Sequence, residues 1–422
     1  MTLFLIIFLG IIVFLIIKSE NRILFNELFW MFVFWGLIIG VYIFSGVIWK
    51  YRMSFSLGLY LVTILLVFLF GRKCGYNKKV KTFFRRGSNR KYQLYCWIGI
   101  SGVILFSVDY IRLNGLFTAK SGYDISILGS IGNLMVPILL VLGLYIFADT
   151  LMNTGKISVR ALLLLGIYSI PCVLNSGRES IVFIFVGVAA IWGYYARFHK
   201  KSYRYVSPKK LMRGILIIIL AIGTIGFIVH ISKERFGDNE VSTFLNTHNV
   251  TSATIEEAET WGPFEFLYYN ICSYFSHQIS FLEFILKEYH GPYMFGMYEL
   301  NIISRRLPTF LGLDYTLVSR QLRQMYAYTG VSYSGDWFTV LGSFIVDFGR
   351  IGSVIAIFAC GYFVGKIKKK IRVCDDTRYA VLQAIICICM FSSIQLGPFY
   401  NTLIYGAFIW WFIIFGKDES YS

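Results

Sequence analysis

The stretch WFTVLGSFIVDFGRIGSVIAIFACGYFVG, residues 337–365, is followed directly by KIKKKIRVCDDTR, residues 366–378. The first stretch is apolar and long enough to cross the hydrocarbon layer of a membrane, which takes about 20 helical residues. The second contains six Lys or Arg residues. An apolar span followed by a basic connector is typical of a transmembrane helix that ends at the cytoplasmic surface.

The same alternation of apolar stretches and short charged connectors runs along the whole chain of 422 residues. Hydrophobic residues make up 57% of it and charged residues 15%, against roughly 25% charged in ordinary soluble domains. We therefore expect an all-α polytopic membrane protein, a single integral membrane domain over residues 1–422 with about eleven membrane-spanning helices (ten to twelve). The expected spans are 2–17, 23–48, 54–70, 93–109, 125–147, 161–174, 180–196, 211–231, 337–365, 379–395 and 398–415.

The first expected span, 2–17, lacks a basic N-terminal region and a small-residue cleavage site. We interpret it as a retained helix and not as a removed signal peptide. The eight cysteines show no paired spacing of the zinc-binding type outside the membrane. No disulfide framework, metal site or cofactor is predicted from them.

Basic residues decide the expected orientation. Residues 72–91 contain nine Lys or Arg, residues 197–213 contain seven, and residues 366–378 contain six. When the spans alternate in direction these connectors share one side, which the positive-inside rule assigns to the cytoplasm. The N-terminus is then expected outside and the C-terminus inside. The formal net charge of +17 is explained as a topology signal, and no nucleic-acid partner is predicted.

One connector, residues 232–336, is about a hundred residues long. It is expected to form a large extracytoplasmic loop between the eighth and ninth spans. Residues 262–289 mix apolar and aromatic residues with isolated polar ones, which favours an amphipathic or re-entrant helix at the membrane interface. Two further helical pieces are expected at 298–307 and 317–328.

His277 and Glu283 lie on the first of these helices, roughly two turns apart, where they are expected to share a face. A histidine at the boundary between water and lipid is a candidate general base. The alternative is that His277 is a polar anchor at the interface.

Four arginines of the loop lie within nineteen residues of one another: Arg305, Arg306, Arg320 and Arg323. Guanidinium groups bind phosphate oxygens in pairs and stay charged, so the group suits an anionic ligand. Arg178 lies at the outer mouth of a span, where an ionisable residue is costly unless it is paired or functional. The alternatives are contacts with lipid headgroups or acidic residues of the loop for the four, and pairing with Glu179 for Arg178.

Asp347 and Arg350 are three residues apart near the middle of the expected span 337–365. The expected role is a buried pair that locks helix packing, in preference to a catalytic couple. The triplet Asp347-Phe-Gly349 also occurs in protein kinases, but no glycine-rich nucleotide loop accompanies it here.

Two stretches resemble segments of bacterial oligosaccharide repeat-unit polymerases, the Wzy-type O-antigen and capsule polymerases. Residues 175–183, NSGRESIVF, resemble their Ser-Arg-Gly-type segment. Residues 336–352, DWFTVLGSFIVDFGRIG, resemble the segment after their large outer loop, in which an aromatic–Thr pair precedes Asp-Phe-Gly and a later Gly. The layout of the spans is also similar. Glu179 departs from the family pattern, which often has Gly there.

The resemblance implies a metal-independent helical membrane glycosyltransferase (GT-C-like) of the bacterial inner membrane. Such enzymes join repeat units carried on undecaprenyl pyrophosphate, which is the lipid of both donor and acceptor, at the outer face of that membrane. The growing glycan leaves its lipid and moves to a hydroxyl on the incoming unit. The product would be the O-antigen of a lipopolysaccharide, a capsule or an exopolysaccharide. A chain-length regulator protein is a further expected partner, beside the membrane lipid itself.

In this chemistry the departing pyrophosphate needs cationic stabilisation where its charge develops. The five arginines named above are the candidates. The acceptor hydroxyl must lose its proton during attack, for which His277 is the first choice of base and Glu283 the second.

Two other classes of protein stay open. An O-antigen ligase uses the same donor but a different acceptor, which the sequence does not report. A flippase or another transporter of lipid-linked oligosaccharides is the non-enzymatic alternative. Transporter folds usually show two related halves and functional charges near the midplane. Here the candidate charges lie toward one outer face, which favours chemistry at the membrane surface.

Overall fold

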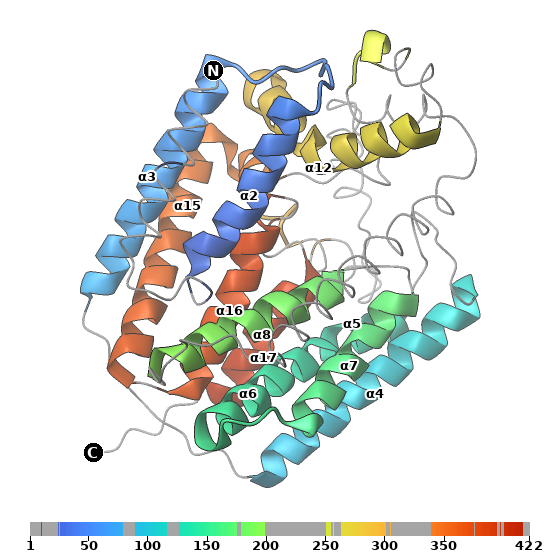
Figure 1. The fold of residues 1–422 in the computed structure, drawn as a ribbon, viewed down its shortest axis with the longest axis vertical. Coiled ribbons are helices and arrows are strands. Elements are labelled where there is room, and N and C mark those ends of the chain that lie inside the picture. The colour runs from blue at the N-terminus through green and yellow to red at the C-terminus, as the bar shows by residue number, and fades with distance from the viewer. Residues whose placement is uncertain are drawn as a thin grey trace, which may run out of the picture.

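The computed structural model describes residues 10, 24, 26–78, 89–115, 126–174, 179–198, 250–254, 256, 263–300, 304, 339–374, 376–394, 397 and 401–416. Within these ranges the regular structure is helical, and the β-type contact is an isolated antiparallel bridge between Trp49 and Val250. The helices, labelled in Figure 1, are α2 (Glu27–Phe44), α3 (Phe55–Asn77), α4 (Asn89–Asn114), α5 (Ile127–Met135), α6 (Pro137–Thr154), α7 (Val159–Leu174), α8 (Glu179–Phe198), α12 (Pro263–Glu288), α15 (Val340–Cys374), α16 (Thr377–Ser392) and α17 (Thr402–Phe415).

Much of this helical structure is long and apolar enough to cross a membrane. Six stretches qualify in the described part of the chain: Glu27–Phe44, Phe55–Asn77, Lys91–Asn114, Ile127–Thr154, Glu179–Ala196 and Val340–Arg372. The helices α7, α16 and α17 are apolar but shorter. The expected spans 2–17 and 211–231 lie outside the described residues. The helices thus indicate a multi-pass, all-α membrane protein, and the number eleven stays a prediction.

Residues 125–147, expected as one helix, are divided between two. α5 ends at Met135 and α6 begins at Pro137. Proline has no backbone N–H and its ring clashes with the preceding turn, so it suits the start of a helix and not its interior. The two helices together still cover the 28 residues from Ile127 to Thr154, which is enough for one crossing.

Polar caps explain where several helices begin. The side chains that accept a hydrogen bond from a backbone N–H of the first turn are Asn26, Ser54, Ser126, Asp376 and Asn401. Such caps satisfy N–H groups that have no partner inside the helix. The helices α16 and α17 therefore begin next to Asp376 and Asn401, and not at the expected residues 379 and 398.

The helices α3 and α15 pack side by side along their lengths (Figure 1). Four glycines line the contact, in the pattern Gly-x-x-x-Gly on each helix: Gly71, Gly75, Gly361 and Gly365. A Cβ added at Gly75 would lie 2.0 Å from the backbone oxygen of Tyr362, and one at Gly365 would lie 2.0 Å from the backbone oxygen of Arg72. Small residues allow helix backbones in a membrane to approach this closely.

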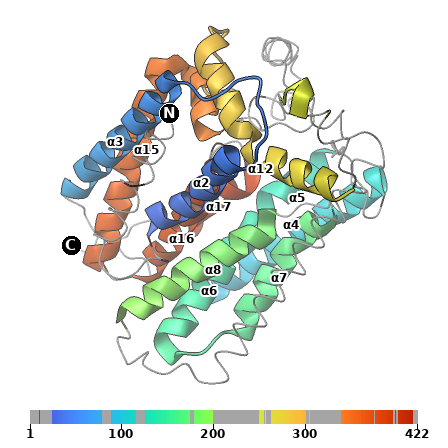
Figure 2. The ribbon, with the colours of Figure 1, turned by 45° about the horizontal axis from the view of Figure 1, so that its top comes forward.

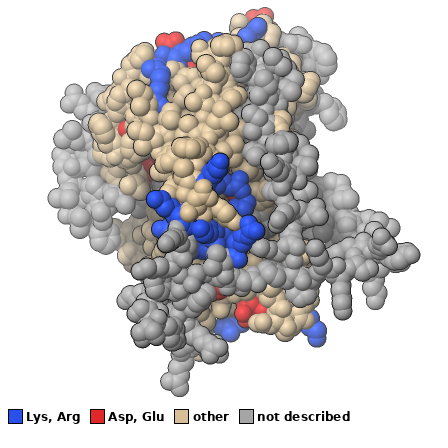
Figure 3. Space-filling view, turned by 90° about the vertical axis from the view of Figure 1, so that its left-hand side faces the viewer, with Lys and Arg blue, Asp and Glu red and all other residues tan. Residues whose placement is uncertain are grey.

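Because residue numbers rise together along this contact, α3 and α15 run parallel and end at the same end of the molecule. Arg72 and Lys73 lie in the C-terminal part of α3, just before its last turn, and Lys366, Lys368, Lys369 and Lys370 lie in the C-terminal part of α15. Figure 3 shows basic side chains gathered on this side of the protein. For the described residues, the expectation that the basic connectors after these two helices share one side is therefore confirmed. The assignment of that side to the cytoplasm stays a prediction.

The opposite end of this helix pair is covered by α12, which contacts α2, α3 and α15 (Figures 1 and 2). This helix is the largest described part of the expected outer loop. Residues 276–286 are all buried, polar and apolar alike. This half of the segment is therefore packed against other helices, and its expected position at the boundary between water and lipid stays a prediction.

Candidate functional site at the junction of α12 and α15

The middle of α15 is interrupted at Gly349, whose backbone has φ 73° and ψ 178°. Positive φ is readily adopted by glycine and strained in other residues. The interruption frees carbonyl groups that a continuous helix would use itself. Val346 O accepts from Met294 N at 3.2 Å, and Asp347 O accepts from Phe295 N at 2.8 Å. The chain after α12 is thus bonded to the backbone of α15 at its kink.

The carboxylate of Asp347 extends this connection. Its two oxygens accept hydrogen bonds from the backbone N–H groups of Tyr298 and Glu299, each at 2.9 Å, and the side chain is fully buried. Helical bonds follow, from Leu300 N to Gly296 O and from Ser304 N to Leu300 O, both 2.9 Å. Asp347 is therefore an N-terminal cap supplied by another helix. It holds the start of the expected helix 298–307.

Arg350 binds the end of α12. Its Nε donates to Leu286 O at 2.7 Å and its Nη2 donates to Lys287 O at 3.1 Å. These are carbonyls of the last turn, which have no partner inside the helix. The short connection from α12 to the turn at Tyr298 is consequently tied at both ends to the kink of α15.

Asp347 and Arg350 were expected to form an ion pair with each other, and the structure gives them different partners. Gly349 lies between them and leaves the helical backbone conformation. The regular spacing that brings residues i and i+3 together is therefore lost. Both residues still join helices, but through backbone groups.

Glu283 ties α12 to the start of α3. Its Oε2 accepts from the backbone N–H of Ser54 at 2.9 Å and from the Ser54 hydroxyl at 3.1 Å, while its Oε1 lies 2.7 Å from Lys287 Nζ. Ser54 is itself the cap of α3. With these partners, the fully buried carboxylate of Glu283 holds α12 against α3. This role differs from the expected one, in which Glu283 was the second choice of general base.

His277 lies on the same helix and is also buried, with its ring edge-on to Phe281 at 5.5 Å between centroids. It belongs to a row of buried polar residues on α12: Ser276, His277, Gln278, Ser280 and Glu283. Burial of so many polar groups is costly unless each has a partner. This row distinguishes α12 from the apolar helices around it.

The remaining candidates lie next to described residues but not among them. Arg178 precedes α8, and Arg305, Arg306, Arg320 and Arg323 follow Ser304; all five lie outside the described residues. Glu179, the acidic neighbour of Arg178, accepts from Asn401 Nδ2 at 2.7 Å. This contact links the start of α8 to the cap of α17. It also gives Glu179 Oε2 a hydrogen-bond partner other than Arg178.

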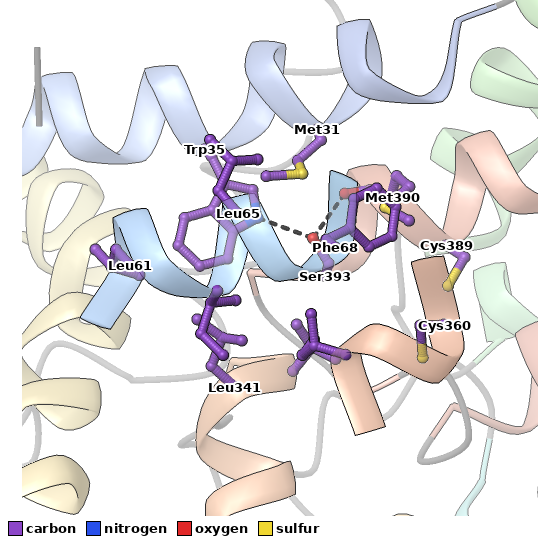
Figure 4. Close-up of a pocket in the computed structure, with 13 residues that line it drawn as sticks. Met31, Trp35, Leu61, Leu65, Phe68, Leu341, Cys360, Cys389, Met390 and Ser393 are labelled. Carbon is purple, nitrogen blue, oxygen red and sulfur yellow. Dashed lines mark hydrogen bonds between the residues drawn. The ribbon is translucent and has the colours of Figure 1, made fainter. Parts of the chain in front are cut away.

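A cavity of about 80 Å³ lies among α2, α3, α15 and α16 (Figure 4). Its lining is apolar apart from Ser393, whose hydroxyl accepts from Trp35 Nε1 at 2.8 Å and donates to Met390 O at 2.8 Å. None of the candidate site residues lines it. In the described part of the chain, no group of three His, Cys, Asp or Glu side chains is arranged to hold a metal ion.

No family model, curated protein or solved structure matches the chain at a significant level. The class of protein defined by the fold is a helical, multi-pass membrane protein.

The sequence contains signals for several of these contacts. The Gly-x-x-x-Gly spacing on α3 and α15 is a recognisable helix-packing motif. Ser54 directly before an apolar stretch is a recognisable cap. The partners of Asp347 had no such signal, because they are backbone groups about fifty residues away.

Proposed function

We propose that the protein is a glycosyltransferase that polymerises undecaprenyl-pyrophosphate-linked oligosaccharide repeat units at the outer face of a bacterial inner membrane. The N-terminus would lie outside and the C-terminus in the cytoplasm. The product would be an O-antigen, a capsule or an exopolysaccharide. The support comes from the resemblance of residues 175–183 and 336–352 to Wzy-type polymerases, together with the multi-pass helical fold.

One observation carries the proposal. Asp347, within the stretch that resembles the polymerases, binds the backbone at Tyr298 and Glu299. The chain that starts there leads within a few residues to Arg305 and Arg306. We infer that the Asp-Phe-Gly-Arg stretch positions the segment that bears the candidate pyrophosphate ligands. This role would explain why the motif is useful in the proposed reaction.

In the reaction, a hydroxyl of the incoming unit attacks the anomeric carbon of the growing glycan, and the bond from that carbon to the pyrophosphate oxygen breaks. Arginine side chains stabilise the negative charge on the departing pyrophosphate. The candidates are Arg178, Arg305, Arg306, Arg320 and Arg323. His277 is the proposed base for the hydroxyl proton. Glu283 is assigned to positioning α12, since Ser54 and Lys287 already bind it.

The test uses purified protein in lipid vesicles with lipid-linked repeat units. Arg178→Ala and Arg306→Ala are each expected to abolish chain extension while membrane insertion is unchanged. Arg112→Ala, an exposed arginine on α4, is the control and should extend chains normally. Normal extension by a protein carrying both Arg178→Ala and Arg306→Ala would disprove the pyrophosphate assignment.

A deletion strain separates the three classes of protein. Loss of a polymerase leaves products with one repeat unit. Loss of a ligase leaves long chains on the carrier lipid, and loss of a flippase leaves no repeat unit at the surface. The proposal requires the first outcome.

A further inference from the structure

A basic patch lies where α3 and α15 end together. It consists of Arg72, Lys73, Lys78, Lys366, Lys368, Lys369, Lys370 and Arg372. Figure 3 shows the gathered Lys and Arg side chains on this face. The two halves of the patch are almost 300 residues apart in sequence and meet because the four glycines of the α3–α15 contact hold the helices parallel.

One acidic side chain in the described part of the chain pairs with this patch. Glu27 Oε1 lies 2.9 Å from Arg72 Nη2 and 3.6 Å from Lys368 Nζ, and Glu27 is fully buried. Arg72 and Lys368 are thereby directed toward the helix bundle. Lys73 and Lys366 are exposed, and Lys369 is half-buried. In the described part of the chain, the exposed Lys73, Lys78 and Lys366 therefore give this face an excess of positive charge.

The length of α15 indicates where the basic patch lies relative to the membrane. Its mostly apolar part before Lys366, residues 340–365, has 26 residues and is kinked at Gly349. At 1.5 Å per residue these residues correspond to about 39 Å along the helix. The hydrocarbon layer of a bilayer is roughly 30 Å thick. The last turns of α15 therefore extend into the headgroup layer, where phosphate groups are the abundant anions.

We propose that the basic patch is a binding site for the phosphate headgroups of anionic phospholipids. Lysines at a membrane surface attract anionic lipid headgroups within a Debye length of about 8 Å. Because lysines from two helices converge here, one or two headgroups can contact several cations at once. This inference does not depend on the proposed glycosyl transfer.

The experiment measures lipid binding to the full-length protein in detergent by native mass spectrometry, with phosphatidylglycerol and phosphatidylcholine as the probes. The patch variant carries Lys73→Gln, Lys366→Gln and Lys369→Gln and keeps the two partners of Glu27. The control variant carries Lys50→Gln, Arg52→Gln and Lys156→Gln, three exposed cations outside the patch. Both variants lose the same net charge.

The wild-type protein and the control are expected to retain phosphatidylglycerol in preference to phosphatidylcholine. The patch variant should bind phosphatidylglycerol about a hundredfold more weakly, since three lysines are lost, with phosphatidylcholine binding unchanged. Equal loss in both triple variants, or no loss in the patch variant, would overturn the proposal. If the triple variant does not fold, the single changes Lys73→Gln and Lys366→Gln must each still weaken phosphatidylglycerol binding, and a failure of both would overturn it as well.

Discussion

At Asp347, one carboxylate caps a turn that belongs to another part of the chain. Its oxygens each accept a backbone N–H, and Gly349 next to it releases two carbonyls for the same segment. A carboxylate suits this position because both of its oxygens accept hydrogen bonds and neither donates. The residue type is therefore dictated by the two N–H groups that face it.

Replacement of Asp347 by Asn should weaken this cap. The amide nitrogen is a donor, so it cannot accept a hydrogen bond from the backbone N–H that it would face. A donor left unsatisfied in a buried site costs about 1–3 kcal/mol. We expect Asp347→Asn to lower the thermal stability and to abolish chain extension in the vesicle assay. Asp109→Asn is the control, because Asp109 is also buried and accepts from Ser126 N at 2.7 Å at the start of α5. If both variants lose extension equally, the effect of Asp347 is one of stability alone.

Gly349→Ala tests the kink itself. Alanine at φ 73° and ψ 178° is strained by about 1–3 kcal/mol, because this region is essentially restricted to glycine, and its Cβ would lie 3.2 Å from the Tyr293 ring. We expect a lower melting temperature by thermal denaturation in detergent. Gly166→Ala on α7 has nothing within 4 Å of the added Cβ and should be neutral or slightly stabilising. A Gly349→Ala protein as stable as Gly166→Ala would contradict the positive φ.

Among whole elements, the pair of α3 and α15 is the most tightly joined. Hydropathy identified both as membrane helices, since length and apolar content are properties of each segment alone. Hydropathy cannot predict that these two helices pair, because an apolar helix surface can face lipid or another apolar helix equally well. Glycines such as Gly71 and Gly365 determine the pairing, because their small size lets the two helix backbones approach each other closely.

Gly75→Leu should force α3 and α15 apart. The added side chain would begin 2.0 Å from the backbone oxygen of Tyr362, which cannot move without the helix. We expect a strong loss of folded protein, measured as the monodisperse fraction in size-exclusion chromatography after detergent extraction. Gly166→Leu, at an open position on α7, should leave that fraction unchanged. Equal yields of the two variants would show that the helices do not approach this closely.

Across the whole molecule, Glu27 connects four helices at the end opposite α12. It begins α2 and binds Arg72 of α3, Lys368 of α15 and Gln383 of α16, the last at 2.7 Å. At the other end, Glu283 and Arg350 connect α12 with α3 and α15. Polar contacts thus join the same helices at both ends of an apolar bundle.

Glu27→Gln should destabilise the protein by about 3 kcal/mol, because the half-buried Arg72 loses its opposite charge. The readout is the midpoint of thermal unfolding. The double variant Glu27→Gln with Arg72→Gln should recover part of the loss, since it removes both charges of the pair. Additive losses in the double variant would mean that the two residues do not interact.

Hydropathy and charge along the chain were enough to establish a helical membrane protein with basic connectors, because burial in lipid and attraction to one membrane surface act on each segment separately. The expected pairing of Asp347 with Arg350 was wrong, although both residues do join helices. Their partners became known from the folded arrangement, in which backbone groups of distant segments meet. Every residue except proline has the same backbone N–H and C=O groups, so the sequence does not show which of them Asp347, Arg350 and Glu283 contact. Those contacts depend on how the helices pack.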